Sequence, residues 1–155
     1  MDAIELDAID RKILRLLQEN GRRQNTDLAD QVGLSPSPCL RRVRLLEEAG
    51  AIDRYVALAN PEAIGLNMTL FVRVTLERQS QKTIERFVSE VERIPNVLEC
   101  YLVAGGYDFL LKVVVRDLDD FRRVHIDHLG QIEGIRNVET EIPLQVIKRT
   151  TVLPV

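Results

Sequence analysis

Residues 25–50 read NTDLADQVGLSPSPCLRRVRLLEEAG and decide the fold of the amino-terminal part of the chain. Apolar residues within 28–32 predict a short helix that ends at Gly33, because glycine readily takes the left-handed conformation that closes a helix. Ser35 and Pro36 then supply an N-cap and a proline at the first helical position, so a second helix begins there and runs to the end of the stretch. Two helices joined by so short a turn predict a helix-turn-helix.

An earlier helix completes this unit. Asp7 is placed to cap it, with Asp10 three residues further on, and Gly21 ends it. Apolar residues recur at helical spacing between these limits: Ile9, Ile13, Leu16 and Leu17. We therefore expect three helices within a DNA-binding domain of residues 1–50.

The helix after Ser35 has two different sides when it is projected at about 100° per residue. Its apolar side holds Cys39, Val43 and Leu46. The opposite side is a stripe of one hydroxyl and two guanidiniums, and a helix that enters the major groove uses such groups to read base edges. Arginine pairs with guanine through two hydrogen bonds, and serine at a helix start holds a phosphate. The predicted DNA-binding residues are Ser35, Ser37, Arg41, Arg42 and Arg44, with Arg42 at the edge of the stripe and assigned to phosphate.

Charge alone does not favour nucleic acid, because the formal net charge is −3. The distribution of charge is more informative, since no acid lies between Asp30 and Glu47 while three arginines do. The alternative is a solvated helix face on which the arginines pair with Glu47 or Glu48.

The second half of the chain alternates strands and helices in the order βαββαβ. A strand over 68–76 is followed by a helix over 80–94, two strands over 97–104 and 107–115, a helix over 117–132 and a last strand over about 135–147. The fold class is α+β: a winged-helix-like helix-turn-helix domain and a ferredoxin-like domain. Pro143 lacks an amide donor, so we expect an edge strand or a bulge there.

Between these domains, residues 52–58 have the alternation of a connecting strand. We expect a hinge over residues 51–65 and an effector-binding and oligomerisation domain over residues 66–155.

Composition excludes several classes of protein. No apolar run is long enough for a membrane span, and the acidic start of the chain is no signal peptide. The two cysteines point to a reducing cytosol, and both are expected to be buried, Cys100 on a strand face with Leu98 and Leu102. His125 and His128 have no third ligand nearby, so packing is the preferred explanation for them. We expect no metal, no cofactor and no enzyme, because no catalytic motif is present.

Taken together, these segments resemble the leucine-responsive/AsnC (feast/famine) family of transcriptional regulators over essentially the whole chain. The resemblance is carried by residues 7–14, 20–22, 28–29, 32–35, 39–43, 50–52, Pro61, Gly65, 105–108 and Lys148. It implies an effector domain that forms homodimers, which commonly assemble into octamers, and amino-acid effectors bound where dimers meet. The family's effector loop maps onto Ala104, Gly105, Gly106, Tyr107 and Asp108.

The residue types in this loop also favour ligand binding, independently of the resemblance. Glycines allow a close approach of backbone amides to a ligand and can take positive φ, and the Asp108 carboxylate can meet an α-ammonium group. The alternative is a plain hairpin turn, for which two successive glycines are typical.

The expected function is that of a sequence-specific regulator that binds double-stranded DNA and responds to a small effector, an amino acid. Its expected location is the cytoplasm, in association with the nucleoid. Two alternatives stay open: an architectural DNA-binding protein that ignores ligands, and an amino-acid-binding allosteric subunit.

Overall fold

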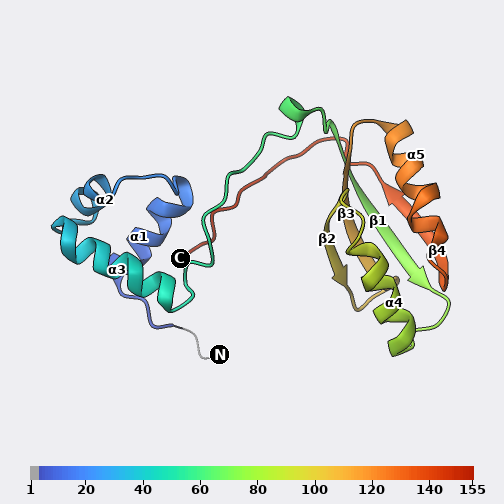
Figure 1. Cartoon of the computed structure of the whole chain (residues 1–155), viewed down its shortest axis with the longest axis horizontal. Helices are drawn as coiled ribbons and strands as arrows, with labels where there is room; N and C mark the ends of the chain where they lie inside the picture. The colour runs from blue at the N-terminus through green and yellow to red at the C-terminus, as the bar shows by residue number, and fades with distance from the viewer. Residues whose placement is uncertain (1–3) are drawn as a thin grey trace. The chain divides into compact units, whose positions relative to one another are not determined.

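The computed structural model describes residues 4–155 and divides the chain into two compact units (Figure 1). One unit contains the residues up to Leu58 together with Lys148–Val155, and the other is Ala59–Ile147. The last segment, which we expected within the second domain, therefore groups with the first unit. Residues 1–3 of that predicted domain lie outside the described residues.

The first unit contains the three predicted helices, α1 (Ala8–Glu19), α2 (Asn25–Val32) and α3 (Pro36–Glu48). Asp7 caps α1, since its side chain accepts a hydrogen bond from the Asp10 amide at 2.8 Å. The Asp10 carboxylate accepts one from the Asp7 amide at 3.3 Å, which completes a capping box. The predicted start of α1 is confirmed.

The turn between α2 and α3 also has the predicted geometry. Gly33 is left-handed, with φ of 73°, and the Leu34 amide donates to the Ala29 carbonyl at 2.9 Å. The turn brings the apolar sides of the helices together around one core. The buried residues of this core are Ile13, Leu14, Leu28, Ala29, Val32, Cys39, Val43 and Leu46.

The second unit has the predicted βαββαβ order, with short 3₁₀ turns at Glu62–Ile64 and Leu129–Gln131. Its elements are β1 (Met68–Leu76), α4 (Gln81–Val91), β2 (Val97–Leu102), β3 (Phe109–Val115), α5 (Leu118–Asp127) and β4 (Ile135–Glu141). The strands form one antiparallel sheet in the order β2-β3-β1-β4. This order and connectivity are those of the ferredoxin-like fold.

One face of the sheet is covered by α4 and α5 (Figure 1). Alternate residues of β1, from Leu70 to Leu76, are buried on this side with Phe87 of α4 and Val124 of α5. The Phe87 and Phe109 rings lie 4.3 Å apart between centroids. The opposite face carries the other β1 residues, from Thr69 to Thr75, and no helix of the unit covers it.

Several sequence-based expectations about strands are wrong. Residues 52–58 form no strand, because no backbone partner in the described chain pairs with them. β4 ends at Glu141 and not near residue 147. It stops two residues before Pro143, whose missing amide cannot extend the ladder. The expectation of an edge strand there is consistent with the position of β4 at the edge of the sheet.

The expectation that Cys100 is buried is also wrong. Cys100, Leu98 and Leu102 are exposed, since β2 lies at the edge of the sheet, where the helices cover less of its face. Leu118, at the first turn of α5, is exposed as well.

Candidate nucleic-acid interface and effector pocket

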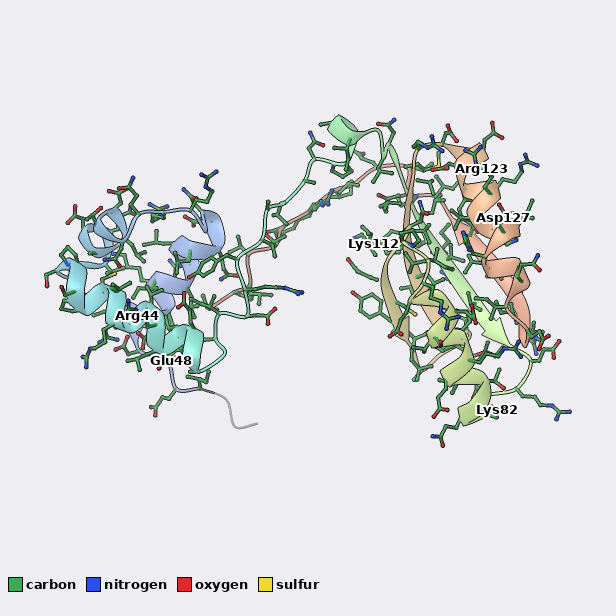
Figure 2. All side chains as sticks on the ribbon, viewed as in Figure 1. Arg44, Glu48, Lys82, Lys112, Arg123 and Asp127 are labelled. Atoms are coloured by element: carbon green, nitrogen blue, oxygen red, sulfur yellow. The ribbon has the colours of Figure 1, made fainter. Side chains whose placement is uncertain are left out.

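The outward side of α3 is the first candidate site. Cys39, Val43 and Leu46 are buried, as predicted, so the remaining sides of α3 face away from the core. Arg41 and Arg44 are exposed, and Arg44 is labelled on α3 in Figure 2. Within residues 4–155 neither guanidinium forms an ion pair. The alternative in which these arginines pair with Glu47 or Glu48 is therefore absent from the described part of the chain.

The start of α3 presents polar groups to solvent. Ser35 is the N-cap residue, but its hydroxyl makes no capping hydrogen bond, and both Ser35 and Ser37 are exposed. Asn25, at the start of α2, donates through Nδ2 to the Pro36 carbonyl at 2.8 Å. This bond, which joins the starts of two helices, has no signal in the sequence because it depends on how the helices pack.

Arg42 has a different environment from its two neighbours. Its Nη1 atom donates to Asp7 Oδ2 at 2.7 Å and to Asp10 Oδ1 at 2.8 Å. These carboxylates, which also form the capping box of α1, hold the pKa of the Arg42 guanidinium above its usual value. The expectation of a free Arg42 for phosphate needs correction, since its charge is largely neutralised within the unit.

The second candidate site is a cavity of about 580 Å³ beside the hairpin between β2 and β3. Three predicted effector residues line it, Ala104, Gly105 and Asp108. The other lining residues, which sequence reasoning missed, are Gln79, Ile84, Leu102 and Val103. Gly106 and Tyr107 are not part of this lining.

Asp108 is buried, with 5% of its surface exposed, and it joins the hairpin to the end of β1. Its carboxylate accepts hydrogen bonds from the Leu76 amide at 2.7 Å and from the side-chain amide of Gln79. Its own amide donates to the Val74 carbonyl at 2.9 Å. Both carboxylate oxygens thus have a protein donor, although each can accept one more hydrogen bond.

The glycines of the hairpin do not have the predicted conformation. Positive φ values among residues 4–155 occur at Gly33, Gly50, Gly65 and Gly134, so neither Gly105 nor Gly106 has a positive φ. A Cβ atom at either position would meet no atom within 4 Å. The argument that these glycines are required for backbone conformation is wrong.

Tyr107 lies under a cation, since the Arg73 guanidinium carbon is 5.1 Å from the centroid of its ring. Arg73 also pairs with Glu141 of β4. Tyr107 therefore belongs with residues of the uncovered sheet face.

The described residues contain neither a candidate metal site nor a candidate membrane-spanning helix. Residues 4–155 contain no group of three or more side chains that could hold a metal ion. In the same part of the chain, no helix has both the length and the apolar character needed to cross a membrane.

Comparison with known families identifies both units. Residues 69–153 match the family model described as the Lrp/AsnC ligand binding domain. The chain belongs to the Lrp/AsnC family. Residues 6–53 of this Lrp/AsnC protein match a winged helix-turn-helix DNA-binding model. The resemblance seen in the sequence and the predicted fold class are both confirmed.

Curated relatives agree with this assignment. The leucine-responsive regulatory protein of Klebsiella pneumoniae is 40% identical over 146 residues, which cover 94% of this chain and 89% of that protein. The protein of the same name from Escherichia coli K12 is 39% identical over 146 residues, which again cover 94% of this chain and 89% of that protein. The Lrp/AsnC protein is thus a transcriptional regulator with a DNA-binding and a ligand-binding domain, as the sequence predicted, and not an enzyme.

Solved structures give the same result. A transcriptional regulator from Neisseria meningitidis in complex with L-Met has a TM-score of 0.92 and 41% identity, covering 97% of each chain. An AsnC family regulator from Agrobacterium tumefaciens has a TM-score of 0.91 and 40% identity, covering 96% of this chain and 97% of that one.

Proposed function

We propose that this regulator binds operator DNA through α3 and that a small amino acid changes this binding. The observation that carries the DNA assignment is the pair Arg41 and Arg44, exposed on the side of α3 opposite its core contacts. An arginine without an internal partner is free to form two hydrogen bonds to a guanine edge. Ser37 extends the same surface toward the start of the helix.

The role we propose for Ser35 is phosphate binding. Its hydroxyl is not used in capping, and the positive end of the α3 dipole lies beside it. For Arg42 we propose a positioning role, because its ion pairs to Asp7 and Asp10 hold α3 against the start of α1. It acts on DNA through the orientation of α3 rather than by contact.

We propose that the effector binds beside the hairpin of Ala104, Gly105, Gly106, Tyr107 and Asp108. The cavity there combines a buried carboxylate and an amide with the apolar side chains of Ile84 and Leu102. Such a mixture suits a molecule with a charged ammonium group and an apolar side chain. The L-Met complex of the Neisseria meningitidis relative supports an amino acid as the class of ligand.

We further propose that the chain forms a homodimer through the uncovered sheet face, and octamers from dimers. Phe71 and Leu110 lie on this face half-buried, and Tyr101 lies there exposed. An uncovered face with large apolar side chains is a surface that another protein chain can cover. A regulator of chromosomal DNA would act at the nucleoid, so we place it in the cytoplasm.

The test is an operator titration repeated with each proteinogenic amino acid, with light scattering on the same samples. We expect tight operator binding that salt weakens, and a shift in affinity with at least one amino acid. An operator affinity that no amino acid or related metabolite alters would favour the ligand-independent architectural protein. Binding no tighter than to random DNA would contradict the assignment of α3.

A further inference from the structure

The chain passes between its two units twice, although a single linker would suffice to connect them. It leaves the DNA-binding unit after Leu58 and returns to it at Lys148 (Figure 1). Between these points lies the entire ligand-binding unit. Both ends of the ligand-binding unit are therefore connected along the chain to the DNA-binding unit.

The returning segment makes specific contacts with α1. The Leu153 amide donates to Gln18 Oε1 at 2.6 Å, and Gln18 Nε2 donates to the Leu153 carbonyl at 3.3 Å. One glutamine side chain thus satisfies both backbone groups of Leu153. Val155 packs against the apolar core of the DNA-binding unit.

The preceding residues make few contacts. Leu144 is fully exposed, Ile147 is 85% exposed, and residues 142–150 contain no helix or strand. The segment is thus fixed at two places, at β4 through its pairing with β1 and at α1 through Leu153 and Val155.

Both connections meet at the same end of α1. Tyr55 and Leu58 of the first connection line a groove at the end of this helix, and Thr151 of the second lines it too. Tyr55 is fixed there by a hydrogen bond from its hydroxyl to Glu47 Oε1 at 2.9 Å. Helix α1 is the element of the DNA-binding unit on which both connections converge.

We propose that residues 148–155 form a strap that holds the DNA-binding unit by α1 and limits the orientations available to α3. The contacts that hold the strap to α1 and the core are two hydrogen bonds and the packing of half-buried Val155, so the strap can detach without unfolding the unit. Because only residues 142–147 separate β4 from the strap, a ligand that shifts the β4 edge changes the fraction of molecules with the strap attached. This inference goes beyond the proposed function. Only its last step, in which a bound ligand changes attachment of the strap, rests on the proposed function.

The experiment compares Val155→Asp with the matched control Val146→Asp in the full chain. Val155 packs against the core, whereas Val146 is 66% exposed. Both variants therefore introduce the same charge, but only Val155→Asp removes the contact with the core. Hydrogen exchange of the Leu153 amide measures whether the strap is attached to α1. An operator titration measures how this attachment affects DNA binding. We expect Val155→Asp to lose protection at Leu153 and to bind operator about three- to tenfold more weakly, because a freer domain has a lower effective concentration at a second half-site. Val146→Asp should match the parent in both.

Gln18 provides an independent variant. Gln18→Ala removes both hydrogen bonds and should act like Val155→Asp, whereas Gln18→Glu keeps the acceptor for the Leu153 amide and should have a smaller effect. Circular dichroism verifies that α1–α3 remain folded. If Val155→Asp and Gln18→Ala bind operator as the parent does, the strap is a passive tail and the proposal is overturned. If the parent itself binds no operator, the proposed function fails, while exchange at Leu153 still tests attachment.

Discussion

At the scale of single residues, Arg41, Arg42 and Arg44 show how neighbours on one helix can have separate roles. Arg42 is used within the protein, where two carboxylates bind it. Arg41 and Arg44 lie in solvent without such a partner among the described residues. These two guanidiniums are therefore free to contact DNA, as we propose.

Arg41→Ala and Arg44→Ala should each weaken binding to the specific operator by roughly 1–3 kcal/mol, because each loses contacts to base edges. Binding to random DNA should change much less. Fluorescence anisotropy at fixed salt measures both, and Arg123→Ala in the ligand-binding unit is the matched control (Figure 2). Equal losses on specific and random DNA would mean that the arginines contact phosphate alone.

Asp108→Ala should destabilise the ligand-binding unit by roughly 1–3 kcal/mol, since it leaves the buried Leu76 amide without an acceptor. Asp108→Asn keeps one acceptor oxygen and should lose less. Both should impair the response to an effector. Calorimetry measures the stability, with exposed Asp127→Ala as control. An Asp108→Ala protein that melts like the parent yet ignores the effector would show that the carboxylate serves the ligand alone.

At the scale of helices and strands, the contact between α1 and α3 depends on ionised carboxylates. The Asp10 amide and then the Arg42 guanidinium hold the pKa of Asp7 below its ordinary value near 4. A carboxyl whose pKa is lower in the folded state adds stability above its unfolded pKa. That stability is lost as the pH falls through the folded value.

The DNA-binding unit should therefore lose stability as the pH falls below about 4. In Arg42→Met this dependence should be smaller, although the Asp10 amide preserves part of it. Thermal unfolding at pH 7 and pH 3 measures the effect, and the transition that Arg42→Met shifts at pH 7 identifies the unit. An unchanged pH dependence in Arg42→Met would indicate that the ion pair adds nothing in solution.

Elements with local signals were predicted well. Asp7 and Asp10 lie three residues apart, and Gly33 ends its helix through its own φ angle, so both signals are contained in one turn of chain. Distant pairs were not predictable. Arg42 lies 35 residues from Asp7, and Gln79 lies 29 residues from Asp108. Such contacts depend on the packing of whole elements, which periodicity does not specify.

The other incorrect predictions concern the position of a strand within the sheet and the backbone angles of the hairpin. The alternation of Leu98, Cys100 and Leu102 predicted a buried face, but periodicity does not reveal that β2 lies at the sheet edge. Two successive glycines correctly predicted a hairpin, but not its backbone angles. The assignment of individual site residues stays a prediction.

At the scale of the whole molecule, assembly should depend on the uncovered sheet face. Leu110→Glu places a charge on this face and should raise the dimer dissociation constant about 100-fold or more, because an unpaired charge in an apolar interface costs roughly 3 kcal/mol. Leu118→Glu, at an exposed position of α5, is the matched control. Light scattering at micromolar concentration measures both. A Leu110→Glu protein that remains dimeric would mean that subunits meet elsewhere.

The return of residues 148–155 to the first unit also has a consequence during synthesis. Ribosomes add about 5–20 residues per second, so Leu153 follows Leu58 by roughly 5–19 s. Throughout that interval the three helices are already available to fold, but Gln18 has no Leu153 to bind. The DNA-binding unit is thus completed only after the entire ligand-binding unit has been translated. A nascent chain, or one cut short by premature termination, would carry a helix-turn-helix that lacks the contacts of Leu153 and Val155.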